Sequence, residues 1–510
     1  MSANASGWGG GYVTDVPYIP GYYRHQSPLH LDLACLIGGV AGLHLTPGRP
    51  LSYLELGCGR GFGALALAVC NPAWQVLGID FNPAHIAAAQ ALAAEAGVAN
   101  ARFVEADLAT FAADPASHDI PEVDVASLHG VWSWVGDAVR AGIVGLLARK
   151  VRPGGIVHLS YNALPAWQGA LGLQRLVRAA GERLAASSER QVEAGFDIVR
   201  TLAAAHAFHL HGNPFVDSLI ERSDHRQTTY LAHEFMNEAW RPCFHADVVA
   251  ALAEAKLSWV GSAQLLENFS ALMLSDEVRS VSARFDDPVM RELVKDVCLR
   301  RGLRQDVFVR GPRRLPTSER DAMLGNVVLG LMCPEAEFDW EFKVPSGSAA
   351  LEERFFGPIV TAVAQGPRRV SELLALPELS RHDNPAELVG MLVGTDQALP
   401  LLAPPGAPDP RIILFNRLAA KHFVRPGNLN NGSALAVSGT GAPVPCTMLD
   451  LFVAARLDED KPPDVASWAA MLGQGQPETE QERLHGFIEG LLTERAPLWR
   501  RLGALAAPAR

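Results

Sequence analysis

A glycine-rich loop is the segment of this sequence whose residue types and spacing point most directly to chemistry. It follows an apolar run at 51–56 and reads Glu55-Leu56-Gly57-Cys58-Gly59-Arg60-Gly61. Glycines at alternate positions allow a sharp turn from strand to helix and let a ligand approach the backbone closely. The free N–H groups of the following helix would then face an anionic part of that ligand.

The spacing of the glycines bears on which ligand this loop binds. Counted from Gly57, the dinucleotide pattern Gly-x-Gly-x-x-Gly/Ala fails at Phe62, and counted from Gly59 it passes with Ala64, which alone is a weak match. The carboxylate of Glu55 would repel a pyrophosphate. It suits a cation, such as the amino group of a methionine moiety.

Three further motifs follow at the ends of predicted strands. Asp80, in Gly78-Ile79-Asp80-Phe81, lies 25 residues after Glu55, close to the spacing of about 20 at which an acid bonds ribose hydroxyls. Glu105-Ala106-Asp107-Leu108 ends the third strand, and Arg152-Pro153-Gly154-Gly155 precedes the fifth. Read singly, Asp80 and Asp107 are also residues that cap a helix or a turn.

The elements that must position these motifs alternate between strand and helix. Apolar runs predict strands at 51–56, 75–79, 101–105, 123–128 and 156–160, and helical patterns lie at 29–43, 62–70, 83–96 and 138–150. This alternation predicts an α/β fold with a doubly wound, mostly parallel, Rossmann-like sheet. Two late segments with strand character, 257–262 and 306–309, would complete the sheet after helical insertions at 166–242 and 266–304.

The rest of the chain predicts additional regions around this core. We expect an N-terminal arm or lid at 1–28, a core at 29–165, and the helical insertions with the late strands at 166–312. A linker at 313–348 follows from its Pro, Gly and Ser residues. Three short helical stretches (351–364, 370–375, 385–392) and an apolar segment at 399–402 predict an α+β, winged-helix-like module at 349–510.

Composition excludes several classes of protein. The 510 residues are 48% hydrophobic and 19% charged, enough apolar material for sizeable cores. With a net charge of −11, the protein lacks the overall positive charge typical of nucleic-acid-binding proteins, so no nucleic-acid partner is expected. Seven scattered cysteines form no CxxC pair, which argues against a disulfide framework and a cysteine zinc site, and no metal is expected. Without an apolar span or a signal-like start, we expect a cytoplasmic protein.

Taken together, the four motifs resemble the class I S-adenosylmethionine-dependent methyltransferases. The resemblance implies S-adenosyl-L-methionine as the cofactor, with its methionine end held by Glu55, Gly57, Gly59 and Gly61. It implies that Asp80 bonds the ribose, with Phe81 beside the adenine. It also implies that Asp107 bonds the adenine amino group, with Leu108 under the ring.

A narrower resemblance concerns one bacterial subgroup that carries a methyltransferase regulatory domain after the core. It covers about 10–312 and rests on the segments 11–18, 129–134, 160–167, 230–234, 237–242 and 306–311. Some members methylate lysines of surface proteins, so a protein lysine is the implied acceptor. A small-molecule acceptor, such as a natural product, and a non-catalytic sensor of S-adenosylmethionine are the alternatives.

The acceptor side of such a site would lie at the carboxyl ends of the strands. We expect His129 to position the acceptor, take its proton or contact the cofactor, and Tyr161 and Asn162 to hold the acceptor. Tyr12 and Tyr18 of the arm would reach back over the cofactor. A zinc-protease reading of His233-Glu234 fails, because the second histidine is replaced by Asn237; a polar helix face or the wall of a substrate cleft is expected there.

Overall fold

The computed structural model describes most residues of the chain. They are 11–16, 18, 21–112, 119–224, 228–379, 384–438, 440–457 and 462–506. Part of the expected N-terminal arm, residues 1–10, 17, 19 and 20, lies outside them.

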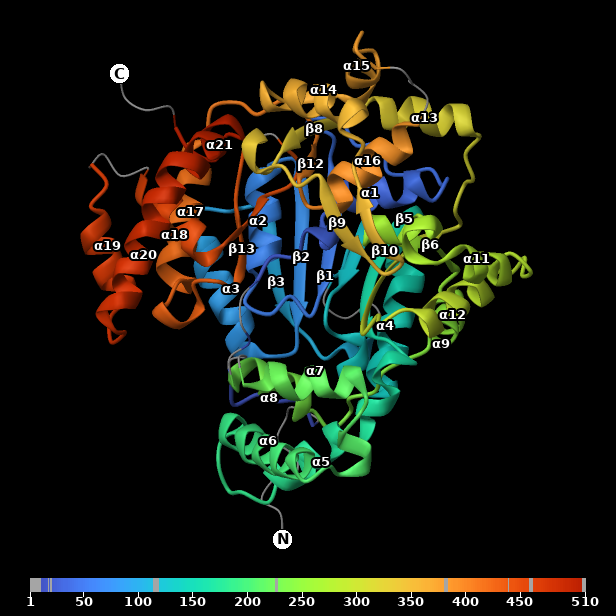
Figure 1. Cartoon of the computed structure of the whole chain (residues 1–510), viewed down its shortest axis with the longest axis vertical. Coiled ribbons are helices and arrows are strands. Elements are labelled where there is room, and N and C mark those ends of the chain that lie inside the picture. Colours follow the sequence, from blue (N-terminus) through green and yellow to red (C-terminus); the bar gives the residue numbers. More distant parts are fainter. Residues whose placement is uncertain are drawn as a thin grey trace.

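A seven-stranded sheet forms the centre of the molecule (Figure 1). Its order is β3-β2-β1-β4-β5-β7-β6, and every neighbouring pair is parallel except the two that involve β7. The strands are β1 (Leu51–Leu56), β2 (Trp74–Asp80), β3 (Ala101–Glu105), β4 (Val123–Leu128), β5 (Val151–Asn162), β6 (Leu257–Ser262) and β7 (Leu303–Arg310). The expected doubly wound, mostly parallel fold is confirmed.

Helices cover both faces of this sheet, because successive strand residues point to opposite sides. In β1, Tyr53 belongs to the hydrophobic core on one face and Leu54 to the core on the other, and neither is exposed. Tyr53 shares its core with α1 (Pro28–Ile37), α2 (Phe62–Cys70) and α3 (Pro83–Glu95). Leu54 shares its core with α4 (Asp137–Lys150) and α9 (His245–Ala253).

Both late strands join the central sheet, as the sequence predicted. β7 nevertheless runs antiparallel to β5 and to β6, so the expectation that both would extend the parallel sheet is wrong for β7. The chain between β6 and β7 forms η6 (Leu265–Asn268), α10 (Ser270–Met273), α11 (Asp276–Ser282) and α12 (Pro288–Cys298). An antiparallel neighbour needs no crossover over the sheet face, so this excursion stays at one edge.

A helical layer lies across one end of the sheet, at the bottom of Figure 1. It consists of η4 (Ala166–Ala170), α5 (Leu171–Gly181), α6 (Ser188–Ala204), η5 (Phe208–Leu210), α7 (Pro214–Ser223) and α8 (Thr228–Phe235). Its apolar faces meet in a separate core that includes Val177, Val192 and Phe196. We call residues 166–235 the insertion layer.

The segment 313–348 is not a linker, contrary to expectation. It contains α13 (Thr317–Gly325), β8 (Val328–Leu331), η7 (Glu335–Glu337), β9 (Glu341–Val344) and β10 (Gly347–Ala350). β8 is the central strand of a three-stranded sheet with β11 (Arg368–Arg369) and β12 (Ala398–Leu401). Only four residues long and fully buried, β8 is too short to stand out between turn-forming Gly and Pro residues.

The helices and the strand predicted for the C-terminal module are present. They are α14 (Glu353–Ala364), α15 (Val370–Leu374), α16 (Pro385–Gly394) and β12. Beyond them lie α17 (Pro410–Phe423), η8 (Pro426–Asn428), the hairpin β13 (Gly432–Leu435) and β14 (Val444–Thr447), α18 (Met448–Leu457), α19 (Val465–Leu472), α20 (Glu478–Gly490), η9 (Leu491–Arg495) and α21 (Ala496–Arg501). Among the described helices, none is long and apolar enough to cross a membrane.

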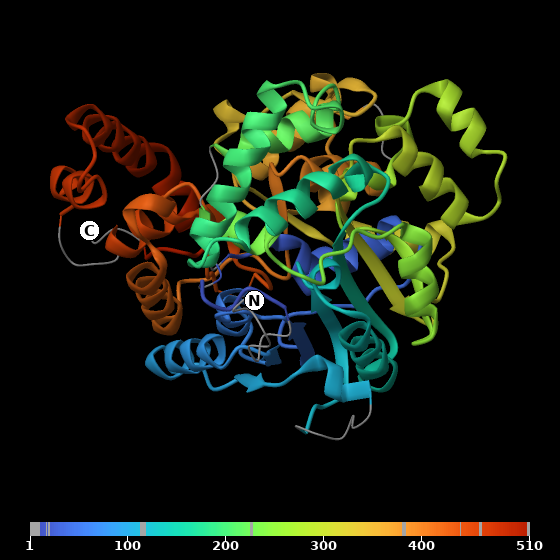
Figure 2. The same cartoon turned by 90° about the horizontal axis from the view of Figure 1, so that it is seen from below.

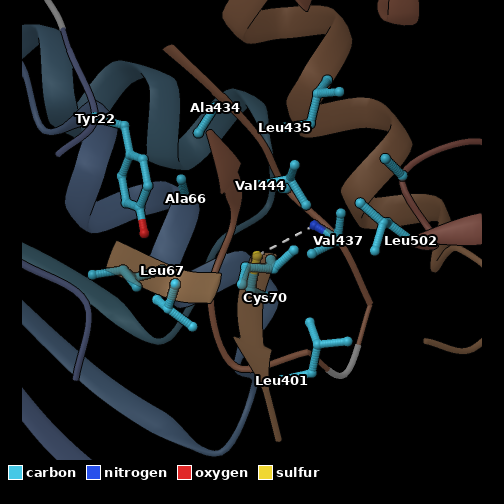
Figure 3. Close-up of a cluster of buried hydrophobic side chains, with 14 of the residues drawn as sticks. Tyr22, Ala66, Leu67, Cys70, Leu401, Ala434, Leu435, Val437, Val444 and Leu502 are labelled. Atoms are coloured by element: carbon cyan, nitrogen blue, oxygen red, sulfur yellow. Dashed lines mark hydrogen bonds between the residues drawn. The ribbon is translucent and has the colours of Figure 1, made fainter. Parts of the chain in front are cut away.

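Figure 3 shows where the arm and the C-terminal module meet the core. Tyr22 of the arm lies beside Ala66 and Leu67 of α2, close to Ala434 of the hairpin. At Cys70, the last residue of α2, the thiol sulfur accepts a hydrogen bond from the backbone N–H of Val437 at 3.3 Å. The arm and the module are therefore both packed on the helix that follows the glycine loop.

Candidate active site

The glycine loop connects β1 to α2 and adopts a backbone that glycine favours. Gly57, Gly59 and Gly61 have φ values of 72°, 52° and 73°. A Cβ at Gly57 would lie 2.4 Å from Val131 Cγ2, and one at Gly61 would lie 2.7 Å from Ala89 Cβ. At Gly59 a Cβ would have no neighbour within 4 Å. The backbone at Gly59 therefore faces open space, where a ligand can approach it.

Asp80, at the end of β2, holds the loop in this shape. Its Oδ2 accepts a hydrogen bond from Gly59 N–H at 2.8 Å, and its Oδ1 accepts one from Asn82 N–H at 2.9 Å. His85 Nδ1 lies 3.3 Å from the same Oδ1. Since a carboxylate offers about four lone-pair positions, one further hydrogen bond can form before a present partner is displaced.

Glu55 is a buried carboxyl group beside the loop. Its hydrogen-bond partner is the Nε2 of Gln26, at 3.5 Å. The pKa of Glu55 is raised to about 8, mainly by burial; the Gln26 hydrogen bond opposes the rise, and the Asp80 carboxylate adds to it. A cation that entered this position would stabilise the ionised form of Glu55.

A cavity of about 670 Å³ opens beside the ends of β4 and β5. Its walls come from the arm, the two strand ends and the insertion layer, with Arg300, Gly302 and Leu303 at the start of β7. Aromatic residues dominate the lining, which includes Tyr12, Tyr18, Tyr23, Trp134, Trp167, Phe215, Tyr230 and Phe235. We call this space the acceptor cavity.

His129 lines the acceptor cavity, where its ring is held by stacking. Its ring stacks on Tyr23 with the centroids 3.8 Å apart, and it lies parallel to the ring of His158 at 6.0 Å. Burial, together with the neighbouring His158, lowers the pKa of His129 to about 3. The imidazole is therefore neutral at pH 7, a state in which one ring nitrogen can accept a hydrogen bond.

Asn162 lines the cavity together with Glu234 of α8. Its side-chain Nδ2 donates a hydrogen bond to Glu234 Oε1 over 3.1 Å. Ser160, two residues earlier in β5, faces the same cavity and accepts a hydrogen bond from Gly130 N–H at 2.9 Å.

Tyr161 does not reach the cavity, so the prediction that it holds the acceptor is wrong. Its hydroxyl is buried on the opposite face of β5, where it donates to Asp306 Oδ2 at 2.5 Å. Arg304 and His245 bond the same carboxylate at 3.0 Å each. Adjacent residues of a strand face opposite sides, so Tyr161 and Asn162 cannot both line one cavity.

A second cavity, of about 1090 Å³, adjoins the acceptor cavity. The two share the side chains of Tyr18, Tyr23, Tyr230 and His233. The far walls of the second cavity come from the C-terminal module, including the β13–β14 hairpin, α20 and α21. We call it the C-terminal cavity.

Comparisons with known proteins agree with this geometry. A model of a methyltransferase domain matches residues 54–155, and a model described as a predicted methyltransferase regulatory domain matches residues 227–310. An uncharacterized protein of Synechocystis is 34% identical over 366 residues, which cover 72% of this chain and 71% of that protein. The chain belongs to the class I S-adenosylmethionine-dependent methyltransferases with a regulatory domain.

A solved structure has the fold of this methyltransferase over almost its whole length. PKMT2 from Rickettsia typhi, in complex with S-adenosylhomocysteine, superposes with a TM-score of 0.67. The match covers 96% of this chain and 100% of PKMT2, at 17% sequence identity. A second relative, an uncharacterized protein of Rickettsia prowazekii, is 31% identical over 153 residues, 30% of this chain and 58% of that protein.

The loop of the methyltransferase fits S-adenosylmethionine. The open backbone at Gly59, the free position on Asp80 and the buried Glu55 carboxyl offer partners for a polar, cationic amino-acid end and a ribose. The ring of Phe81 meets that of Tyr12 edge-on at 5.5 Å, which links the loop to the acceptor cavity.

The predicted adenine end of the methyltransferase site is less distinct. Asp107 is exposed, and its Oδ1 caps η2 (Leu108–Ala112) by accepting a hydrogen bond from Ala109 N–H at 2.9 Å. Leu108 is buried in the core on the α4 face. Asp107 thus has the capping role that its position also suggested, and binding to adenine stays a prediction for both residues.

Two residues that sequence reasoning left without a role in the site belong to the acceptor cavity. Tyr230 and Glu234 lie one helical turn apart on α8, and both line the cavity. The available signals were the family resemblance of 230–234 and the pair His233-Glu234, for which the sequence left a polar helix face or the wall of a substrate cleft open. Both His233 and Glu234 line the cavity, and a substrate cleft there stays a prediction.

Proposed function

We propose that this methyltransferase methylates the side-chain amine of lysine in a protein. The observation that carries the proposal is the acceptor cavity, whose aromatic walls lead to the Asn162–Glu234 pair beside the predicted cofactor site. Aromatic rings attract ammonium groups through their negative faces and exclude water. A carboxylate in the lining of such a cavity suits a cationic side chain better than a neutral one.

The C-terminal cavity supports an acceptor larger than a free metabolite. It continues from the acceptor cavity past the shared residues Tyr18 and Tyr230 and adds about 1090 Å³ of space. A lysine side chain in the acceptor cavity would leave its polypeptide to extend between the arm and the C-terminal module. The name of PKMT2, a protein lysine methyltransferase with the same fold, makes lysine the first acceptor to test.

Each part of the site has a role in this reaction. S-adenosylmethionine, when bound, supplies a methyl carbon that the amine lone pair attacks while the carbon–sulfur bond breaks and its electrons stay on sulfur. Glu55 and the glycine loop hold the amino-acid end, Asp80 bonds the ribose, and Phe81, Asp107 and Leu108 contact the adenine. Tyr12, Tyr18 and Tyr23 exclude water from the methyl path.

The acceptor amine must lose a proton before it can attack, because the ordinary pKa of lysine is about 10.4. Burial in an aromatic cavity lowers that pKa by disfavouring the charged form. Neutral His129, stacked under Tyr23, offers a ring nitrogen that can accept a hydrogen bond from the amine. We assign His129 the positioning of the neutral amine and Asn162 the orientation of the same group.

The experiment that tests the proposal uses a methyl-labelled cofactor and a cell lysate. Purified protein is incubated with both, and the precipitated protein is hydrolysed and analysed for labelled methyl-lysine. Asp80→Ala is the matched control, because losing a charge-assisted hydrogen bond worth about 1.5–3 kcal/mol weakens cofactor binding at least tenfold. Label in methyl-lysine from the parent protein, strongly reduced in the control, supports the proposal.

A small-molecule acceptor is the competing possibility, and the same assay separates the two. Label that stays in the supernatant as a low-mass product, with none in precipitated protein, would contradict a protein acceptor. Label in methylated carboxylates, arginines or histidines of precipitated protein would contradict lysine specifically.

A further inference from the structure

Glu234 brings a carboxylate into the acceptor cavity from a region outside the core. It lies on α8, within the residues that match the regulatory-domain model. The catalytic core contributes its partner, Asn162, at the end of β5. The pair therefore joins the two regions in the wall of the cavity, where Nδ2 and Oε1 lie 3.1 Å apart.

The charge of Glu234 acts on the side of the cavity that faces the cofactor loop. Burial is the main cause that raises the pKa of the Tyr12 phenol, and the carboxylates of Asp80 and Glu234 raise it further. Tyr12 also meets Phe81, the residue after Asp80, at 5.5 Å. Tyr12 thus lies between the loop that holds the cofactor and the carboxylate that faces the acceptor.

The apolar and aromatic residues around Glu234 suit a cation with an apolar stem, whereas the two arginines of the lining, Arg222 and Arg300, are exposed. Tyr18 and Tyr230 line the cavity beside Glu234, and Leu231 and Phe235 of the same helix add apolar surface. A lysine side chain has these two parts, four methylene groups and a terminal ammonium.

We propose that Glu234 is the residue that selects a cationic amine as acceptor, by binding its ammonium form against Asn162 before the amine is deprotonated. The inference rests on the proposed amine acceptor and assigns its recognition to the region named regulatory. On this assignment that region is a substrate-binding part of the active site. A role in which Glu234 only ties α8 to β5 through Asn162 predicts no selectivity for charge.

Two probes that differ only in the amine can distinguish these roles. Nα-acetyl-L-lysine amide and Nα-acetyl-L-norleucine amide share the apolar stem, and only the first carries an ammonium. Their binding to the full chain is measured by ligand-observed NMR titration with S-adenosylhomocysteine present, so that no turnover occurs. Loss of one charge-assisted hydrogen bond corresponds to about tenfold or more in affinity.

Three variants complete the design. Glu234→Gln keeps the shape and can still accept the Asn162 hydrogen bond, and we expect it to lose the preference for the lysine probe while norleucine binding stays unchanged. Glu238→Gln, at an exposed glutamate outside the cavity lining, should keep the parent preference of at least about tenfold. Glu234→Asp should restore part of it. S-adenosylhomocysteine affinity, measured for each variant, reports on folding.

Two results would overturn the inference: a parent protein that binds both probes equally, or a Glu234→Gln variant that still prefers lysine. If Glu234→Gln loses S-adenosylhomocysteine binding as well, the comparison passes to Glu234→Asp, and the absence of any preference of that variant for the lysine probe would count against the inference. The probes do not depend on the natural acceptor. A lysate without labelled methyl-lysine would therefore contradict the proposed function while probe selectivity could still hold.

Discussion

Binding of S-adenosylmethionine should release a proton from Glu55. In the ligand-free protein, burial raises the pKa of this carboxyl to about 8, from an ordinary 4.5. Glu55 then carries a proton in about nine-tenths of molecules at pH 7. If the ammonium of the cofactor faces Glu55, it favours the ionised form and returns the pKa toward its ordinary value.

The size and the sign of the effect follow from the same shift. At pH 7 close to one proton should leave per cofactor bound, and affinity should rise by up to about tenfold per pH unit below pH 8. The stability of the ligand-free protein should change with pH in the opposite direction and fall as the pH rises, because a raised folded-state pKa means that ionisation of Glu55 opposes folding. The stabilising effect of the protonated form is complete below about pH 4.5 and is lost as the pH rises through about 8.

Calorimetry measures the released proton directly. Titrations at pH 6.5–7.0 in two buffers with different ionisation enthalpies give the number of protons exchanged, at a pH where the α-amino group of the cofactor is still charged. Glu55→Gln removes the titrating group with little change in shape and should abolish the release. Equal proton release in the parent protein and in Glu55→Gln, or none in the parent, would refute the assignment of Glu55 to the cofactor ammonium.

Two pairs of variants test the roles of neighbouring residues. Tyr22→Ala should lower the free energy of unfolding by about 3–5 kcal/mol, because its ring is buried between α2 and the C-terminal hairpin. Tyr23 is 38% exposed, so Tyr23→Ala should change the free energy of unfolding by less than about 1 kcal/mol, but it should slow methyl transfer because it exposes His129. Urea unfolding measures the first effect and the labelling assay the second. A large loss of stability in Tyr23→Ala with normal methyl transfer would contradict these roles. Tyr161→Phe should lower the free energy of unfolding by about 1–3 kcal/mol and leave binding of the lysine probe unchanged. Asn162→Ala should weaken binding of that probe. Weaker probe binding in Tyr161→Phe would show that Tyr161 does contribute to acceptor binding.

The core of the fold was predictable because its signals are local. The strand bounds 51–56, 101–105 and 257–262 and the helix 62–70 agree with the structure residue for residue. The segments 51–56 and 62–70 are mostly apolar and end at glycine or at polar residues. The glycine loop was identified for the same reason, since its backbone conformation restricts which residues it can contain.

The features that the sequence could not predict are the direction in which a strand runs and the side of the sheet to which a side chain points. Val307, Phe308 and Val309 are all buried, so β7 has no alternating pattern, and nothing in its sequence distinguishes an antiparallel strand from a parallel one. Tyr161 and Asn162 were both assigned to the acceptor, although the pleat of β5 allows only one of them to line the cavity. Glu234 lies 72 residues from Asn162 in the chain, and only the fold brings them together.

The arm connects all the parts of this site, which explains why so short a segment carries four tyrosines. Near its start, Val13 N–H donates to Asn237 Oδ1 at 2.9 Å, just beyond the insertion layer. Near its end, Gln26 reaches Glu55, and Arg24 forms an ion pair with Asp396 of the C-terminal module. Between these contacts, Tyr12, Tyr18 and Tyr23 line the acceptor cavity while Tyr22 packs on α2.

One consequence is that the regulatory region and the C-terminal module both contribute walls to the candidate active site. The acceptor cavity lacks a wall without α8, and the arm loses its contact at Asp396 and part of its packing around Tyr22 without the C-terminal module. Figure 2, which views the molecule from below, shows the insertion layer and the C-terminal helices on adjacent sides of the sheet. Because α2 follows the glycine loop directly and ends at Cys70, the loop and the contact with the C-terminal module lie at the two ends of one helix.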